Sequence, residues 1–351
     1  MPSQLIDPRR YQEVDLPVFR SELDDFLPAT IYDSHVHVAL PEHRGPVTRE
    51  WITADWPNEV DYRLSVQELA EVQAQLFPGR QVRSLVFTMP SPKYFIEEGN
   101  RYVAEAIRTD AADGLLVTRP EWSQEELLRL LRAGSFVGLK PYPGLVGTRA
   151  DDIPIGAFLP PHHQEVAEAL RLMVVLHIGR PERLRDPSNL REIRELATTR
   201  PGIQLIIAHV GRAYTMTYAE PGLTGLRGLP GVCHDFAMNL NAEVLELALR
   251  EVGPDRLLYG SDLPIALMRG VREHEGDRYI NFSDGAYSWN SPERRKSPEE
   301  EARYTLYLYE ELRAFRTAAE RVGLTPEQVT QVMGANAKRM VEVAKQGLSR
   351  A

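Results

Sequence analysis

Two histidines, His35 and His37, stand two positions apart in the apolar segment IYDSHVHV, residues 31–38. In a β-strand, residues two apart point to the same side, so both imidazoles can reach one point in space. Zinc and similar metals take nitrogen and oxygen ligands, and a catalytic site keeps one position open for water. The pair therefore predicts a divalent metal site. Because the chain has nine histidines, such a pair could also arise by chance, so the pair alone does not establish the site.

Four further polar residues end other apolar segments: Lys140, His177, His209 and Asp262. An imidazole and a carboxylate are suitable additional ligands, so His177 and Asp262 could complete the metal site. A single histidine at a strand end is more often structural, and the prediction therefore depends on these residues meeting at one place. Lys140 ends the predicted fourth strand, and its role stays open at this point.

The elements that must position these residues are eight short apolar runs. Most are rich in Val, Ile and Leu, and none alternates strictly, as expected for strands that are buried on both faces. Helical patterns lie between them, such as the capping box Ser65-x-x-Glu68 before Leu69 and Val72. We predict strands over residues 31–38, 82–88, 114–118, 135–140, 172–177, 203–209, 232–237 and 257–262.

The alternation of strands and helices predicts a (β/α)8 TIM barrel, because parallel strands need crossover connections and eight tilted strands close on themselves. A doubly wound open sheet is the alternative, but the sequence contains no G-x-G-x-x-G turn of the kind that favours that fold. Residues 1–30 would form an N-terminal extension that packs on the barrel, and residues 31–351 a single domain. From residue 299 onward we predict extra C-terminal helices, one of them capped by Thr325.

In such a barrel, catalytic residues gather at the carboxyl ends of the strands. The histidines, Lys140 and Asp262 would therefore meet at that end. Three long stretches also follow strand ends, namely 39–64, 141–161 and 263–297. We expect them to be loops that enclose a substrate.

Arg180 and Arg212 each lie three residues after a strand-end histidine, where a guanidinium could grip a carboxylate with two hydrogen bonds. We therefore predict that both bind substrate, although a solvent-facing arginine is the commoner case. Weaker candidates of the same kind are Arg269, Arg272 and Tyr142.

Four of these segments carry motifs that resemble the amidohydrolase superfamily: HVH, LHIG, IIAHVG and YGSDLP. The closing VMGANAKRM, residues 332–340, is similar to the Asn-Ala-x-Arg helix of the branch that contains aminocarboxymuconate-semialdehyde decarboxylase, related aromatic-acid decarboxylases, and several lactonases and hydratases. The resemblance spans most of the chain and implies a (β/α)8 barrel with a divalent metal, usually zinc or manganese. The implied metal ligands are His35, His37, His177 and Asp262.

The resemblance also implies that His209 sits beside the metal as a substrate-orienting or acid/base group. Superfamily members with two metals place a carboxylated lysine at the end of the fourth strand, which is the predicted position of Lys140. The role of Lys140 therefore stays open between a bridging metal ligand, a substrate-binding amine and a structural ion pair. We expect a metal-dependent hydrolase of a small carboxylated lactone or amide, in which Asp262 takes the proton of a metal-activated water. A decarboxylase of a cyclic or unsaturated acid is the main alternative, and a metal-free lactonase and a non-catalytic, metabolite-binding barrel are the others.

Composition disfavours several other classes of protein. Lys and Arg number 41 against 50 Asp and Glu, a net charge of −9 without a long basic run, so nucleic acid is not an expected partner. No apolar run reaches the roughly 18 residues of a membrane span, and the first residues do not resemble a signal peptide. The single cysteine, Cys233, allows no internal disulfide, so we expect a cytoplasmic protein. Family members often form dimers, so the resemblance implies a homodimer.

Overall fold

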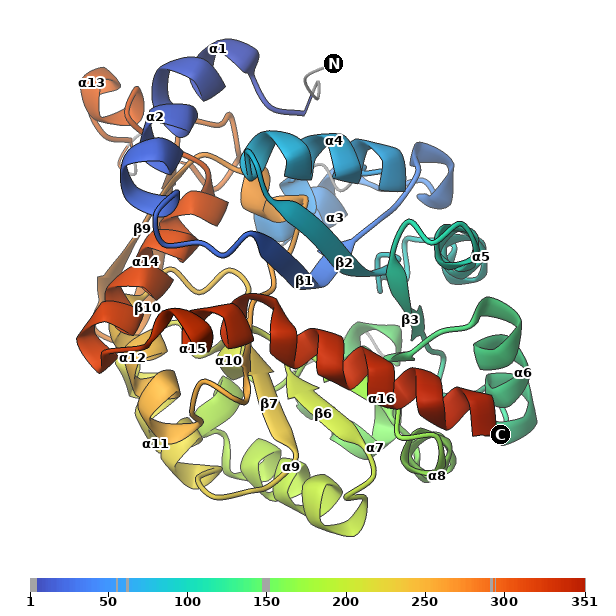
Figure 1. Cartoon of the computed structure of the whole chain (residues 1–351). Helices are drawn as coiled ribbons and strands as arrows, with labels where there is room; N and C mark the ends of the chain where they lie inside the picture. Colours follow the sequence, from blue (N-terminus) through green and yellow to red (C-terminus); the bar gives the residue numbers. More distant parts are fainter. Residues whose placement is uncertain are drawn as a thin grey trace.

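The computed structural model describes residues 5–54, 56–60, 63–146, 152–290, 293 and 295–350. Its centre is a sheet of eight parallel strands in which each strand pairs with the next along the chain (Figure 1). This order confirms the predicted (β/α)8 barrel. The strands are β1 (Thr30–His37), β2 (Gln81–Phe87), β3 (Asp113–Val117), β4 (Gly138–Lys140), β5 (Met173–Leu176), β6 (Gln204–Ile207), β7 (Val232–Asp235) and β8 (Leu257–Leu258).

The barrel closes where the chain beyond β8 runs beside β1. There the Asp262 N–H donates a hydrogen bond to the His35 carbonyl at 2.8 Å. A Cβ at Gly260 would lie 2.7 Å from the His35 Cβ, so only glycine permits this approach without a shift. The strand β8 is shorter than the predicted strand over 257–262, because the chain leaves extended geometry and reaches a φ of +57° at Asp262.

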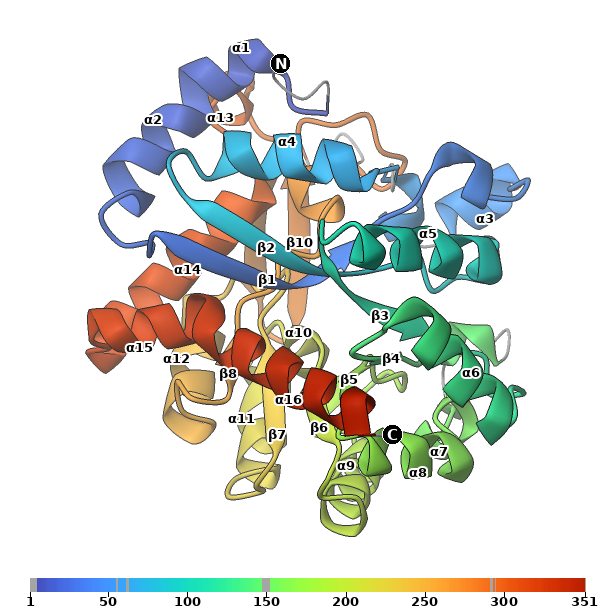
Figure 2. The same cartoon turned by 45° about the vertical axis from the view of Figure 1, so that its right-hand side comes forward.

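Helices follow the strands and cover the outside of the barrel (Figures 1 and 2). The capping box at the start of α4 is confirmed, since the Ser65 side chain accepts from the Glu68 N–H and the Glu68 side chain accepts from the Ser65 N–H. The predicted Thr325 cap is confirmed in the same way with Gln328. The main covering helices are α4 (Val66–Leu76), α5 (Ile96–Arg108), α6 (Gln124–Gly134), α8 (Pro161–Ala169), α9 (Pro187–Thr199), α11 (Met216–Gly225), α12 (Ala242–Glu251) and α14 (Tyr307–Val322).

The last helix, α16 (Asn336–Arg350), crosses the amino ends of the strands (Figure 2). The Asn336 side chain donates to the carbonyl of Leu257, the first residue of β8. The Lys345 ammonium lies 2.9 Å from the carboxylate of Asp113, the first residue of β3. Because α16 covers this end, the opposite, carboxyl end of the barrel is the one that the loops can shape into a site.

The long stretch 263–297 is more than the predicted loop. It contains an antiparallel hairpin of β9 (Gly270–Glu275) and β10 (Arg278–Ser283). Gly276 has a φ of +60° in the turn between them, a conformation that glycine adopts without strain. The other two long stretches carry short helices: η3 (Pro41–His43), α3 (Arg49–Thr53), η4 (Trp56–Glu59), η5 (Pro143–Leu145) and α7 (Ile155–Phe158).

The C-terminal part is helical as predicted, with two interruptions, at residues 302–306 and at residues 323–325. Helix α13 (Pro298–Glu301) ends before α14 begins, and between them Leu306 forms an isolated bridge with Arg269. After α14 the chain continues through α15 (Pro326–Thr330) and η10 (Gln331–Ala335) into α16.

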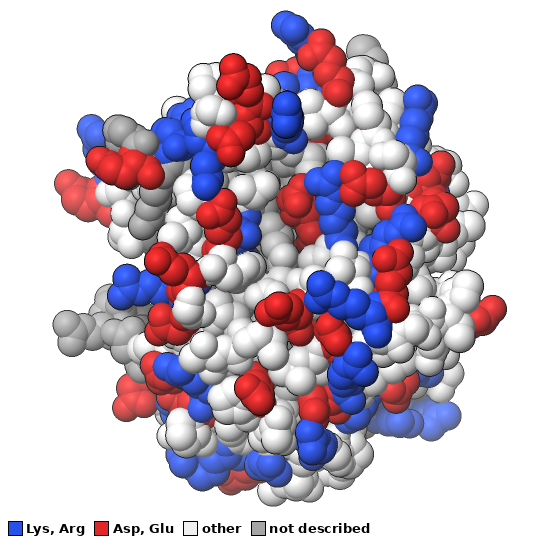
Figure 3. Space-filling view, turned by 90° about the vertical axis from the view of Figure 1, so that its left-hand side faces the viewer, with Lys and Arg blue, Asp and Glu red and all other residues white. Residues whose placement is uncertain are grey.

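The chain before β1 is helical over α1 (Pro8–Arg10), η1 (Tyr11–Asp15), α2 (Leu16–Val18) and η2 (Phe19–Leu23). Ion pairs join this segment to later parts of the chain, one between Glu22 and Arg313 of α14 and one between buried Asp15 and Arg269. On the face shown in Figure 3, basic and acidic side chains lie interspersed. None of the helices in the described ranges combines the length and apolar character needed to cross a membrane.

Candidate functional site

A cavity of about 500 Å³ lies among the loops at the carboxyl ends of the strands. Loops that follow β1, β4, β5, β6 and β8 contribute to its walls. The structure thus brings together the residues that the sequence selected at strand ends. They are His35, His37, Lys140, His177, His209 and Asp262.

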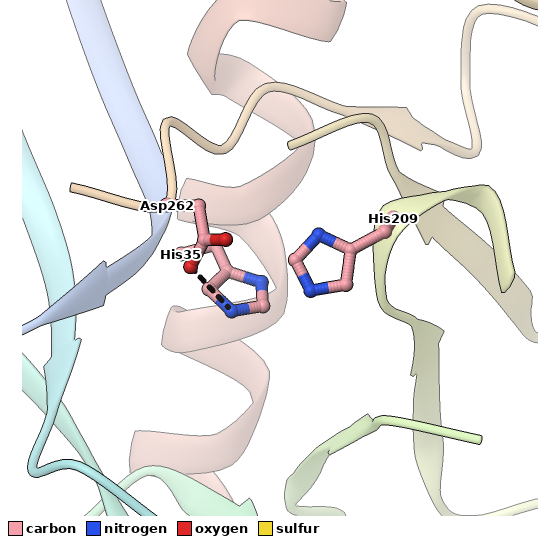
Figure 4. Close-up of side chains that lie close together, drawn as sticks. All are labelled: His35, His209 and Asp262. Carbon is pink, nitrogen blue, oxygen red and sulfur yellow. Dashed lines mark ion pairs between the residues drawn. The ribbon is translucent and has the colours of Figure 1, made fainter. Parts of the chain in front are cut away.

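The tightest group at the base of this cavity consists of His35, His209 and Asp262, in which one ligand atom of each residue lies within 4.8 Å of the others. Figure 4 shows His35 beside Asp262, with His209 reaching towards them from the other side. The Asp262 Oδ1 atom lies 3.6 Å from His35 Nε2 and 3.1 Å from His37 Nε2. Two imidazoles of one strand therefore meet at one carboxylate oxygen, as the His-x-His spacing predicts.

The protonation states of these groups suit a divalent cation. Burial lowers the pKa of His37, and it lowers the pKa values of His35 and His177 well below the ordinary value. Burial opposes ionisation of Asp262, but the hydrogen bond from His37 and the neighbouring imidazoles outweigh it and lower the pKa to about 2. At neutral pH the site therefore offers neutral imidazoles and an ionised carboxylate, which are the forms that bind zinc or manganese.

Asp235, at the end of β7, orients two of the histidines. Its Oδ2 atom accepts from His35 Nδ1 at 3.0 Å, and its Oδ1 atom accepts from the His209 backbone N–H at 2.7 Å. A proton on His35 Nδ1 leaves the lone pair of Nε2 directed at the cavity, which is the arrangement found behind metal-bound histidines. Asp235 was not among the predicted site residues, because it stands two residues before the end of the predicted strand 232–237, whereas it ends β7 in the structure.

The backbone around His209 is strained. His209 and Val210 have φ values of +56° and +49°, a region that side chains with a Cβ rarely adopt. The bond to Asp235 and a second one, from His209 Nδ1 to the Ala237 carbonyl at 3.0 Å, hold this conformation. Because Nδ1 donates to that carbonyl, Nε2 of His209 is left as an acceptor that faces His35, with ring centres 4.7 Å apart.

His177 follows β5 and packs its ring 4.8 Å from Tyr142 and 5.4 Å from His209. It lies in the cavity but outside the tightest group. Its Nδ1 atom is buried and has no hydrogen-bond partner among the described residues. A buried nitrogen without a partner is costly, so an additional ligand would relieve this site. Together with the neutral imidazoles and the ionised Asp262, this observation indicates that the residues fit a divalent metal.

Lys140, the last residue of β4, is 1% exposed, and its Nζ lies 3.4 Å from His35 Nε2 and 4.6 Å from the ring centre of Phe87. Burial lowers the pKa of Lys140 to about 8, although Asp235 and Asp262 counteract part of this effect. The amine therefore reaches the predicted metal site from β4, and with this pKa it is mostly protonated at neutral pH.

The placement of Arg180 contradicts the prediction that it binds substrate. Its guanidinium donates to Glu192 at 2.6 Å, to Asn189 at 2.8 Å and to Asp152 at 3.2 Å, and it does not line the cavity. These acceptors occupy Nε, Nη1 and Nη2, so the side chain ties the loop after β5 to α9 instead.

Of the other predicted anchors, Arg212, Arg272 and Tyr142 line the cavity. Arg269 does not, because its guanidinium is bonded to Asp15. Arg183 lines the cavity from the loop after β5 and was not among the predicted site residues. No local signal distinguishes it from Arg180 three residues earlier.

Comparison with known families gives one decisive match. The family model for amidohydrolases matches residues 32–343, which is most of the chain. The chain therefore belongs to the amidohydrolase family, an enzyme family whose members are typically metal-dependent. No curated protein gives a significant sequence match.

Solved structures share the fold at low sequence identity. An amidohydrolase from Burkholderia multivorans with bound zinc is 15% identical over 90% of this chain and 99% of that chain, with a TM-score of 0.55. A probable 2-pyrone-4,6-dicarboxylic acid hydrolase from Acinetobacter baumannii, with citric acid bound, is 16% identical over 89% and 99%, with a TM-score of 0.54. A 2,6-dihydroxybenzoate decarboxylase is 14% identical over 90% and 100%, with a TM-score of 0.51. At these identities the likeness establishes the fold and not the reaction.

Proposed function

We propose that this chain is a metal-dependent hydrolase that opens a lactone or amide bond in a small carboxylated molecule. The observation that carries the proposal is the geometry of Asp262, whose carboxylate lies 3.1 Å from His37 Nε2 and 3.6 Å from His35 Nε2 at the base of the cavity. From this place an ionised carboxylate can receive a proton from an attacking water molecule.

We propose His35, His37, His177 and Asp262 as metal ligands, with His209 beside them, because their protonation states and the unpartnered nitrogen of His177 fit a divalent cation. Zinc is the first choice and manganese the second, and the Burkholderia amidohydrolase with bound zinc supports this order. When bound, such a cation lowers the pKa of a water molecule towards 7 and polarises the carbonyl under attack.

The side chains would then divide the proton transfers. Asp262 accepts the proton of the attacking water and passes it to the leaving group. His209 holds its Nδ1 proton on the Ala237 carbonyl, so its Nε2 can accept a hydrogen bond from the attacking water or from the substrate and orient it. Lys140 supplies an amine beside His35 that can hydrogen-bond the substrate carboxylate or carbonyl.

The second candidate is the decarboxylation of a cyclic or unsaturated acid, which the similarity in fold to 2,6-dihydroxybenzoate decarboxylase supports. A decarboxylase needs a proton donor for the carbon that loses carbon dioxide, and Asp262 or His209 would supply that proton.

The test follows two products with two probe substrates. Zinc-loaded protein is incubated with 2-pyrone-4,6-dicarboxylate, a lactone, and with 2,6-dihydroxybenzoate, and both acid release and carbon dioxide release are measured. We expect acid release from the lactone without gas, and an Asp262→Asn variant should lower kcat about 100-fold to 10,000-fold. Carbon dioxide release from the benzoate with little net acid, or turnover that survives in Asp262→Asn, would contradict the proposal.

We further propose that the protein acts in the cytoplasm, as predicted from its single cysteine.

Cys233 is buried, and burial raises the pKa of its thiol to about 11. The thiol is therefore not prepared for a role as a nucleophile.

A further inference from the structure

Two arginines in the cavity wall approach the same pair of tyrosines. Arg183 belongs to η7 (Arg183–Arg185) after β5, and Arg272 belongs to β9 of the inserted hairpin. The guanidinium carbon of Arg183 lies 5.6 Å and 5.5 Å from the ring centres of Tyr214 and Tyr279, and that of Arg272 lies 4.9 Å and 4.5 Å from the same rings. The two ring centres are 5.1 Å apart. Two cationic groups from distant parts of the chain thus share one aromatic pair.

Hydrogen bonds orient both guanidinium groups without neutralising them. Arg272 is 8% exposed, and it donates from Nε to Asn281 Oδ1 at 2.9 Å and from Nη1 to the Met238 carbonyl at 2.6 Å. Arg183 donates from Nη1 to the Arg212 carbonyl at 3.4 Å. All three acceptors are uncharged, so the side chains are positioned while their charge remains uncompensated.

Nearby arginines in the same two loops, unlike Arg183 and Arg272, form ion pairs with carboxylates. Arg180 forms an ion pair with Glu192, and Arg269 forms one with Asp15. Across the described ranges, no carboxylate lies within ion-pairing distance of the two arginines that share the tyrosines. The loops therefore separate structural arginines from arginines that keep free charge in the cavity.

The cavity as a whole carries an excess of positive charge. Three arginines and a lysine line it, and Asp262 is the only acidic residue among the described lining residues. Asp262 faces the histidines and is already hydrogen-bonded there. Like charges that are partly removed from water repel one another, and a bound divalent cation would add to the excess. A ligand with a single negative charge would compensate only part of it. The four basic residues are Lys140, Arg183, Arg212 and Arg272.

We propose that Arg183 and Arg272, with Tyr214 and Tyr279 between them, form a subsite for a second carboxylate of the substrate, so that the substrate is a small di- or polycarboxylate. The inference rests on the proposed function, because the subsite holds one part of the molecule whose reacting bond lies at Asp262. Guanidinium edges match the two oxygens of a carboxylate, and the tyrosine rings offer a flat contact for its carbon skeleton. A cation or an uncharged ligand would leave the arginines uncompensated.

Titration calorimetry with a matched pair of ligands tests the subsite. Isophthalate carries two carboxylates, and 3-carbamoylbenzoate has nearly the same shape with one carboxylate replaced by an uncharged amide. We expect the wild type to bind isophthalate at least about tenfold more tightly than 3-carbamoylbenzoate, because arginine forms stronger hydrogen bonds with a charged carboxylate than with an uncharged amide. Arg183→Gln and Arg272→Gln should each remove most of this preference.

Two control variants come from the same elements. Arg185→Gln alters an arginine of η7 that pairs with Glu182, and Arg278→Gln alters an exposed arginine of β10. Both should keep the preference of the wild type. Because Arg272 also ties β9 to the Met238 carbonyl, a melting curve of Arg272→Gln accompanies the titration, and Arg183→Gln provides the variant that leaves that bond intact.

Several outcomes would overturn the subsite. They are equal binding of the two ligands by the wild type, no binding of isophthalate at millimolar concentration, and an equal loss of preference in the control variants. If inorganic phosphate displaced isophthalate and bound as tightly as isophthalate does, the assignment of the subsite to a carboxylate would be overturned. A preference that is lost in Arg272→Gln alone would also count against it.

The same titration in a His35→Ala, His37→Ala double variant separates this inference from the proposed function. Suppose that the double variant still prefers isophthalate, while the zinc-loaded wild type hydrolyses none of the probe substrates. The subsite would then be retained and the proposed hydrolase rejected. Hydrolysis by the wild type without any preference for the dianion would do the reverse.

Discussion

The base of the cavity, formed by the histidines and Asp262, and its wall, which contains Arg183 and Arg272, differ in charge. At the base, burial keeps the imidazoles of His35 and His177 neutral, and Asp262 is ionised in contact with His37. In the wall, Arg183 and Arg272 keep their charge, and within the described parts of the chain their hydrogen-bond acceptors are uncharged. The base is prepared to bind a cation and move protons, whereas the wall is prepared to bind an anion. Chemistry and recognition are therefore placed on different parts of the same cavity.

The two parts also differ in the elements that carry them. The base residues lie at or directly after strand ends, where the closed barrel limits their movement. The wall residues lie on connecting loops and on the hairpin β9–β10. Substrate preference can therefore change through the loops while the reaction chemistry of the barrel stays the same.

The largest effect is expected from breaking the base. A His35→Ala, His37→Ala double variant should lose its bound metal, and turnover of a lactone substrate should fall by several orders of magnitude. Metal content by plasma mass spectrometry and initial rates measure the two effects. His274→Ala, a change in the exposed part of β9, serves as the control and should retain both. Normal turnover by a metal-free double variant would reject the metal-dependent mechanism.

A smaller effect is expected from the residue that supports the base. Asp235→Asn removes the charge that accepts from His35 Nδ1 and from the His209 N–H. We expect metal affinity or activity to fall about 10-fold to 100-fold, the usual effect of losing a partner behind a metal-bound histidine. Competition with a zinc-binding dye gives the affinity. An unchanged affinity and rate would mean that the backbone bonds alone orient the two histidines.

The wall should affect substrate binding more than turnover. For a dicarboxylate substrate, Arg183→Gln is expected to raise KM about tenfold and to change kcat much less, because the arginine contacts a part of the molecule that does not react. Steady-state rates over a range of concentrations separate the two constants. A loss confined to kcat would place Arg183 with the base of the cavity instead.

Arg180 should show the reverse behaviour of Arg183. Arg180→Gln removes donors from Glu192 and Asn189, so the free energy of unfolding should fall by about 1–3 kcal/mol while KM stays within about twofold. Denaturant unfolding and steady-state kinetics measure these quantities. An increase in KM without any loss of stability would restore the sequence prediction that Arg180 binds substrate.

The last effect is on the pH dependence of stability and requires no substitution. His35, His37 and His177 have lower pKa values in the folded protein than free imidazole, so as pH falls through about 6.5 the unfolded chain takes up protons before the folded one. The metal-free protein should therefore lose stability below that pH, by at most about 1.4 kcal/mol per pH unit for each histidine. Thermal melting between pH 7 and 5 checks this, and a replacement of the three histidines should flatten the dependence. A stability that rises as the pH falls would show that these imidazoles are charged in the folded state.

Local sequence determined much of the barrel and its base. The apolar runs, the caps at Ser65 and Thr325, and the alternation of strand and helix are short-range features, so the pattern shows them directly. The His-x-His pair and the polar residues at strand ends could be placed together because all parallel strands of a barrel end on one face. Asp235, which ends β7, lies on this face for the same reason.

The tertiary structure decided which arginines form the wall, since Arg212 and Arg272 of the predicted anchors line the cavity, whereas Arg180 and Arg269 do not. Arg180 and Arg183 are three residues apart, as are Arg269 and Arg272, and in each pair one arginine is neutralised and the other faces the cavity. The partner that neutralises Arg269 is Asp15, which lies 254 positions away in the chain. An arginine's role depends on which acid or carbonyl the fold brings beside it, and short-range pattern carries no information about a partner so distant in sequence.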